Sequence, residues 1–141
     1  MRRSNLLAVL VAGLLLIGAA GPAAAQGSLN LSADIPFEFV VGNTTLPAGK
    51  YTVDNRPHPT MVLVQSEDAR NTAIVLTNAV QSKGTLEEGK LVFNRYGDRY
   101  FLSQVWKPGN NTGFQIPKHR RERELAQRAA LFERVIVLAK R

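Results

Sequence analysis

Two histidines and a few loop carboxylates are the side chains of this chain that could perform acid–base chemistry. His58 stands between Pro57 and Pro59, close in sequence to Asp54, and Glu67 lies in a later polar loop. If Asp54, His58 and Glu67 converged, they would supply the base and the orienting group that a hydrolase or isomerase needs. We keep such an enzyme as an alternative, which requires that the three side chains lie close together in the fold.

Other patterns that carry catalysis or hold cofactors are missing from the sequence. No serine stands in a Gly-x-Ser-x-Gly elbow, and there is no glycine-rich phosphate loop or calcium-binding loop. The absence of cysteine excludes thiol chemistry and Cys-ligated zinc, and a metal site needs three or four converging ligands. We therefore predict a protein that is not an enzyme and that has no cofactor or metal.

Basic side chains gather in the last part of the chain. Residues 26–116 hold eight Lys or Arg against eight Asp or Glu, whereas residues 117–141 hold eight against three, a net charge of +5. A local positive field of this kind attracts anionic surfaces and polymers. The candidate anion-binding residues are Lys118, Arg120, Arg121, Arg123 and Arg128.

A second candidate surface is aromatic and consists of Tyr96, Tyr100 and Trp106. Aromatic faces stack on sugars and bases, although the same rings also serve as core residues of a β-sandwich. Phe101 falls on the face opposite Tyr100 and Trp106 in an alternating strand. Either this region is covered on both sides, or one of its faces docks another group.

Strands must position these side chains, because apolar residues alternate with polar ones along most of the chain. Gly97-Asp98 predicts a tight hairpin that pairs Tyr96 with Arg99 and Phe93 with Leu102, with Trp106 on the same face as Phe93. We predict a mainly β fold, an antiparallel sandwich or small barrel of about seven strands. The expected strands are 35–41, 50–53, 61–65, 72–77, 91–96, 99–106 and a last one within 133–139, with loops at 42–45, 83–84, 87–89 and 108–113.

After Pro117 the pattern becomes that of a helix. Residues 118–130 contain no β-branched side chain and are rich in good helix formers, which favours one C-terminal helix with a narrow apolar stripe. We expect the stripe to pack weakly on the sheet and the arginines to stay in water. The β-branched run Val135–Val137 favours a last strand, and continuation of the helix is the alternative.

The first 25 residues have the organisation of a secretory signal peptide. Arg2 and Arg3 precede an apolar run over 6–20, and a small-residue cleavage site ends at Ala25. We expect cleavage after Ala25 and export to the periplasm or the medium, with no transmembrane span in the product.

Removing those 25 residues from the 141 leaves 116, which is enough for one domain. We expect a flexible leader over 26–33 and then a single β-rich domain over 34–141. This domain includes the basic helix at 117–131.

Three stretches of the chain together carry a resemblance to a known group of proteins. They read IPFxFxVG followed by LPAGxY (35–51), NRYGDRYFL (94–102), and IPK leading into RERELA (116–126). The chain resembles small secreted bacterial β-proteins of unassigned activity, and the resemblance implies no catalytic residues. In addition, residues 46–53 are similar to a strand of transthyretin-like and carboxypeptidase-regulatory-like sandwiches, which supports a sandwich and no particular function.

From these observations we expect an exported, non-enzymatic β-domain. Its partner would be an anionic envelope polymer or lipid head groups, bound through the basic helix without specific nucleic-acid recognition. One alternative is a hydrolase or isomerase acting on envelope polymers. Another is self-association or pairing with a protein partner through an uncovered edge strand, for which Ile35–Val41 is the candidate.

Overall fold

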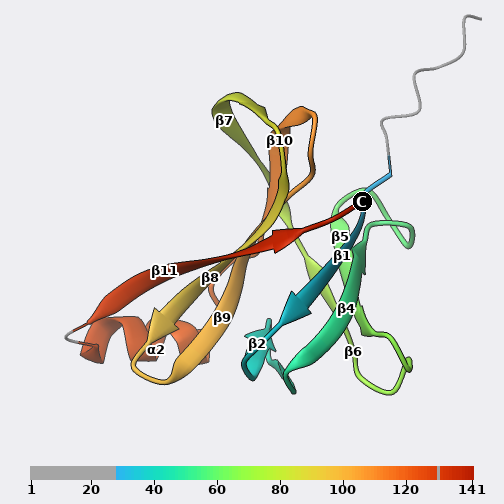
Figure 1. Cartoon of the computed structure of the whole chain (residues 1–141). Coiled ribbons are helices and arrows are strands. Elements are labelled where there is room, and N and C mark those ends of the chain that lie inside the picture. The colour runs from blue at the N-terminus through green and yellow to red at the C-terminus, as the bar shows by residue number, and fades with distance from the viewer. Residues whose placement is uncertain (1–27, 130) are drawn as a thin grey trace, which may run out of the picture.

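A computed structural model describes residues 28–129 and 131–141 and shows two β-sheets packed face to face (Figure 1). The described residues form eleven strands and one short helix near the C-terminus, followed by a final strand. The sheets form a sandwich-like arrangement, and within the described ranges they do not close into a barrel. The predicted signal peptide, its cleavage site after Ala25 and leader residues 26–27 lie outside these ranges.

The smaller sheet has four antiparallel strands in the order β1-β4-β5-β6. Each strand turns alternate side chains toward the larger sheet; in β1 these are Leu31, Ala33 and Ile35. The strands are β1 (Asn30–Ile35), β4 (Gly49–Asp54), β5 (Met61–Ser66) and β6 (Thr72–Leu76).

The larger sheet has seven strands, five of them in the order β11-β8-β9-β10-β7. β2 pairs in parallel with the first part of β9 and antiparallel with β3. In Figure 1, β7 and β10 extend together away from the rest of the sandwich. The strands are β2 (Phe39–Val41), β3 (Thr44–Leu46), β7 (Asn78–Leu86), β8 (Gly89–Tyr96), β9 (Arg99–Trp106), β10 (Asn110–Gln115) and β11 (Phe132–Ala139).

The hairpin of β8 and β9 has the predicted turn and pairing. Tyr96 lies opposite Arg99, and Phe93 lies opposite Leu102. Beyond that pair the register shifts, because Val92 lies opposite Gln104 and Ser103 is left as the extra residue of a β-bulge.

The bulge changes which β9 side chains face the core. Val105 lies opposite Leu91 and is fully buried in the core, while Trp106 is turned to the other face. The prediction that Trp106 shares the face of Phe93 is therefore wrong, since one extra residue reverses the alternation.

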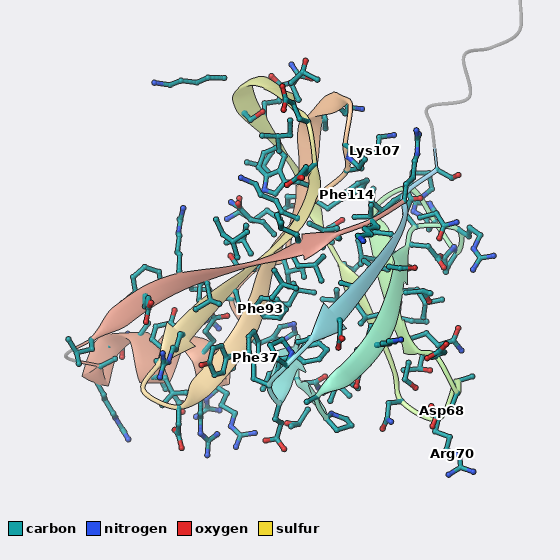
Figure 2. The ribbon with its side chains drawn as sticks, viewed as in Figure 1. Phe37, Asp68, Arg70, Phe93, Lys107 and Phe114 are labelled. Atoms are coloured by element: carbon teal, nitrogen blue, oxygen red, sulfur yellow. The ribbon has the colours of Figure 1, made fainter. Side chains whose placement is uncertain are left out.

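The core between the two sheets is rich in aromatic rings. Phe37 stacks on Tyr100 at 3.8 Å between ring centroids and meets Phe93 edge-on at 5.0 Å. Phe39 also meets Phe93 edge-on, at 5.6 Å. Figure 2 shows Phe37 and Phe93 side by side between the two layers. Edge-on and offset contacts are the favourable geometries for aromatic pairs.

The N-terminal part of the domain differs from the sequence prediction. Asn30–Ala33, expected in the flexible leader, form most of β1, and Leu31 is one of its buried residues. The strand expected over 35–41 is broken at residues 36–38, where Pro36 cannot donate to a ladder. β2 is paired on both sides, so Ile35–Val41 does not form one uncovered edge strand.

Three segments expected as turn or loop contain strands. Residues 44–46 form β3 after a tight turn at Gly42, residues 83–84 lie inside β7, and most of 108–113 belongs to β10. Gly113, which looked like a loop residue, lies opposite Trp106 in β9. A Cβ at Gly113 would come within 2.6 Å of the Trp106 ring, so only glycine leaves room for the indole.

The C-terminal part matches the prediction. The helix, labelled α2 (Arg120–Arg128), begins and ends within the expected residues 118–130. The segment after it is a strand: all eight residues of β11 pair with β8, from Phe132 opposite Tyr96 to Ala139 opposite Gly89. Lys140 continues into a bridge with Ser32 of β1. No helix in the described part of the chain has the length and apolar content that a membrane span requires.

Candidate anion-binding surface

Helix α2 covers part of the outer face of the larger sheet, opposite the aromatic core. Its apolar stripe packs on a small second cluster of buried side chains that β2, β8 and β9 supply. This contact explains why both faces of the β8–β9 hairpin are apolar: one face meets the smaller sheet and the other meets the helix. The residues in contact are Leu125, Ala126 and Ala129 on the helix side and Val40, Tyr96 and Phe101 on the sheet.

One carboxyl group is buried at this contact. Glu122 is 5% exposed, and its Oε1 accepts hydrogen bonds from Asn94 Nδ2 at 3.0 Å and from the Tyr96 hydroxyl at 3.1 Å. Because Glu122 precedes Leu125 and Ala126 by three and four residues, it lies on the helix face that docks on the sheet. Sequence reasoning missed Glu122, although the helical periodicity that identified the apolar stripe includes its position.

The same contact changes the acidity of Tyr96. Burial and the nearby Glu122 carboxyl group raise the pKa of Tyr96 from 10.0 to about 12. Both effects disfavour the tyrosinate, the first because an ion loses hydration and the second because like charges repel.

This shift predicts a loss of stability in alkali. Since the pKa of Tyr96 is higher in the folded chain than in the unfolded one, its contribution is complete below pH 10 and is lost as the pH rises to about 12. We expect the free energy of unfolding, measured with urea, to fall more steeply over this interval in the unmodified protein than in Tyr96→Phe. Parallel curves for the two proteins would contradict the assignment.

All five predicted anion-binding residues are exposed to solvent on or next to α2. Arg120 donates from Nε to Glu124 Oε1 at 3.0 Å, an exposed i,i+4 pair of small energetic value. Within the part of the chain that the structure describes, the side chains of the other four form no hydrogen bond or ion pair. Their positive charges therefore face the solvent without a partner among the described residues.

Two of these arginines share a hollow with a residue that the sequence did not single out. Arg121 and Arg128 line a surface groove of about 240 Å³ together with Arg99, the first residue of β9. Glu124, already paired with Arg120, and Leu125 complete its wall. A neighbouring hollow of about 230 Å³ is also lined by Arg99 and Arg121, and it carries the carboxylates of Glu38 and Asp98.

Arg99 reaches the groove because of its place in the hairpin. It follows the Gly97-Asp98 turn and lies two residues before Phe101, so both belong to the face on which α2 docks. Three guanidinium groups around one groove suit an oxyanion, since each can donate two parallel hydrogen bonds to a phosphate, sulfate or carboxylate. The alternation of strand β9 was the sequence signal that could have added Arg99 to the candidates.

The candidate aromatic residues occupy three different places. Tyr96 is buried under α2, Tyr100 packs on the core side against Phe37, and Trp106 is buried over Gly113. Arg95 lies over the Tyr100 ring at 5.3 Å. The structure therefore does not bring Tyr96, Tyr100 and Trp106 together on one surface.

The side chains considered for acid–base chemistry each have other neighbours. Asp54 is buried and accepts from Arg56 Nη2 at 2.7 Å, which helps to lower its pKa against the opposing effect of burial. His58 Nδ1 lies 2.9 Å from the Thr60 hydroxyl. Within the described ranges no hydrogen bond joins Asp54, His58 and Glu67, and no three His, Asp or Glu side chains are grouped so that they could hold a metal ion.

Comparison with known proteins adds no relative. No protein-family model, no curated protein and no solved structure shows a significant match to this chain. The resemblance to small secreted bacterial β-proteins therefore stays a prediction, and any function must be argued from the side chains themselves.

Proposed function

We propose that this chain is an exported, non-enzymatic binding domain that holds anionic envelope polymers or head groups on the surface formed by α2 and the start of β9. The observation that carries the proposal is the groove lined by Arg99, Arg121 and Arg128. These three guanidinium groups form no ion pair with any residue in the described ranges, so they repel one another, and an anion relieves that repulsion. Export is inferred from the N-terminal sequence alone.

The other basic residues of segment 117–141 support a role in anion binding. Lys118 lies just before α2, and Arg123 lies on it. Both are exposed, and their side chains form no ion pair with the described residues. Charges spread along a helix attract an extended polyanion over a longer range than one groove does, and added salt weakens that attraction. The proposed ligand is therefore a chain or layer of repeated negative groups rather than one small anion.

Heparin-affinity chromatography tests this proposal through charge reversal at the groove. We expect the variant Arg99→Glu/Arg121→Glu/Arg128→Glu to elute at much lower NaCl than the unmodified protein. Each lost charge-assisted hydrogen bond contributes about 1.5–3 kcal/mol, so the three changes together weaken binding by at least about a thousandfold.

A matched control separates the groove from net charge. Lys50→Glu/Arg70→Glu/Lys83→Glu makes the same change in net charge at exposed positions outside α2, and Figure 2 shows Arg70 at the far side of the molecule. We expect this control to elute close to the unmodified protein. Equal elution of the two triple variants would reject the groove as the binding surface.

A further inference from the structure

The end of the larger sheet next to α2 carries two large apolar side chains in water. Leu131, which precedes β11, is 80% exposed, and Phe132, the first residue of β11, is 54% exposed. Exposed apolar groups that stand together commonly mark a surface that docks on something. We call Leu131 and Phe132 the apolar tip.

The apolar tip lies beside the arginine groove. Phe132 of β11 is opposite Tyr96 of β8, and Tyr96 is opposite Arg99 of β9, so the three residues form one row across the sheet. Neighbouring strands are about 4.8 Å apart, which places the backbones of Phe132 and Arg99 about 10 Å from each other. α2 ends at Arg128, three residues before Leu131, and Figure 1 shows the helix at the end of the sheet where β11 begins.

The charges around the apolar tip are mainly positive. Leu131 and Phe132 line a hollow of about 550 Å³ with Arg95 and Glu133, which form an ion pair at 3.4 Å. Arg95 compensates Glu133 and Arg120 compensates Glu124, and the carboxylates next to Arg99 and Arg121 are those of Glu38 and Asp98. The tip is thus an apolar pair that lies beside the arginine groove.

We propose that this end of the sandwich docks on an anionic lipid bilayer. The arginines of the groove contact phosphate head groups, while Leu131 and Phe132 enter the interface between head groups and acyl chains. The inference rests on the proposed function and makes it specific. A soluble polyanion satisfies the arginines but leaves both apolar side chains in water, whereas a bilayer surface takes both kinds of group at once.

The geometry limits this docking to the membrane surface. The apolar stripe of α2 is occupied by the sheet, so the helix cannot also bury that stripe in lipid. Among the exposed apolar side chains of the described residues, Leu131 and Phe132 lie next to the arginine groove, whereas Ile136 and Leu138 stand farther along β11. Insertion of the tip alone makes the attachment shallow and dependent on the negative charge of the lipid.

Co-sedimentation with vesicles tests the proposal. We expect the protein to bind vesicles of phosphatidylglycerol and phosphatidylcholine and not vesicles of phosphatidylcholine alone. Leu131→Ser/Phe132→Ser should bind the anionic vesicles at least about tenfold more weakly, since two buried apolar side chains are lost, yet elute from heparin like the unmodified protein.

The matched control is Ile74→Ser/Leu76→Ser, which removes two similarly exposed apolar side chains from β6 in the other sheet. It should bind both heparin and vesicles normally. If the tip variant binds anionic vesicles as tightly as the unmodified protein, or if the unmodified protein binds heparin but no vesicles, bilayer docking is overturned and anion binding stands. Failure to bind either probe overturns both.

Discussion

Replacing Glu122 with alanine is expected to destabilise the domain by about 2–4 kcal/mol and to loosen α2 from the sheet. The change removes the acceptor of two buried donors, Asn94 Nδ2 and the Tyr96 hydroxyl. A buried donor that loses its partner costs about 1–3 kcal/mol, because it cannot recover a bond to water. Urea unfolding measures the loss, and amide hydrogen exchange of residues 120–128 reports whether the helix opens.

Two other substitutions define the cause. Glu122→Gln keeps an oxygen at nearly the same place and should cost less than Glu122→Ala. Glu124→Ala removes an exposed carboxylate from the same helix, where it pairs only with Arg120, and should cost at most about 0.5 kcal/mol. If Glu122→Ala were as stable as Glu124→Ala, the buried hydrogen bonds would not hold the helix.

The heparin affinity of the two alanine variants supplies a second measurement, because we expect it to change in opposite directions. Removing a negative charge from a basic surface should strengthen heparin binding if nothing else changes, as we expect for Glu124→Ala. Glu122→Ala should instead weaken it, because a loosened α2 no longer holds Arg121 and Arg128 beside Arg99. Tighter binding by both variants would show that the arginines do not need the docked helix.

Replacing Phe93 with alanine is expected to cost about 3–5 kcal/mol. Phe93 is fully buried and meets Phe37 and Phe39 edge-on, so the truncation leaves a cavity between the two sheets. Domains of this size are stable by about 5–15 kcal/mol, so this one change removes much of the total. The midpoint of urea unfolding, with an unchanged slope, measures it.

Phe132→Ala is the matched control, because it makes the same truncation on a half-exposed side chain in the neighbouring strand of the same sheet. Its ring touches only the Tyr96 ring among the aromatic groups of the described residues, at 5.6 Å, so it should cost about 1 kcal/mol or less. Phe93→Leu keeps most of the volume and should recover part of the loss if Phe93→Ala does not fold. A cost for Phe93→Ala no larger than that for Phe132→Ala would exclude Phe93 as a central core residue.

The sandwich could be predicted where the local chemistry was decisive. Gly97-Asp98 allowed a two-residue hairpin turn, and this determined the pairing of Tyr96 with Arg99 and of Phe93 with Leu102. The β-branched residues at 135–137 likewise favoured a strand over a longer helix, and β11 confirms it. In both places propensity and alternation agree with the tertiary contacts.

Other features depend on tertiary contacts that leave little trace in the sequence. β7 and β10 are mostly polar, and few of their residues are buried, so they lack the alternation that reveals a strand; their backbones are held by each other and, for β10, also by β9. The bulge at Ser103 is equally hidden, because a shift of one residue moves Trp106 to the other face without changing the composition.

The candidate site was predicted in part. The five basic residues could be identified from charge alone, and they are exposed. Arg99 could not be identified from charge alone. It comes close to Arg121 and Arg128 only when α2 docks on β9, although Arg99 precedes the helix by some twenty residues in sequence. The apolar tip was equally hidden, because Leu131 and Phe132 fit a helix face or a strand end until β11 is placed.

The bridge between Ser32 and Lys140 joins the first described strand to the last. β11 also completes the edge of β8, so the sandwich is finished only when the most C-terminal residues are in place. While the chain emerges N-terminus first from the ribosome or a translocon, Leu31 and Leu91 therefore lack the packing that the last strand supplies. Such contacts between distant segments make folding slow and late, which would suit the export that the N-terminal sequence predicts.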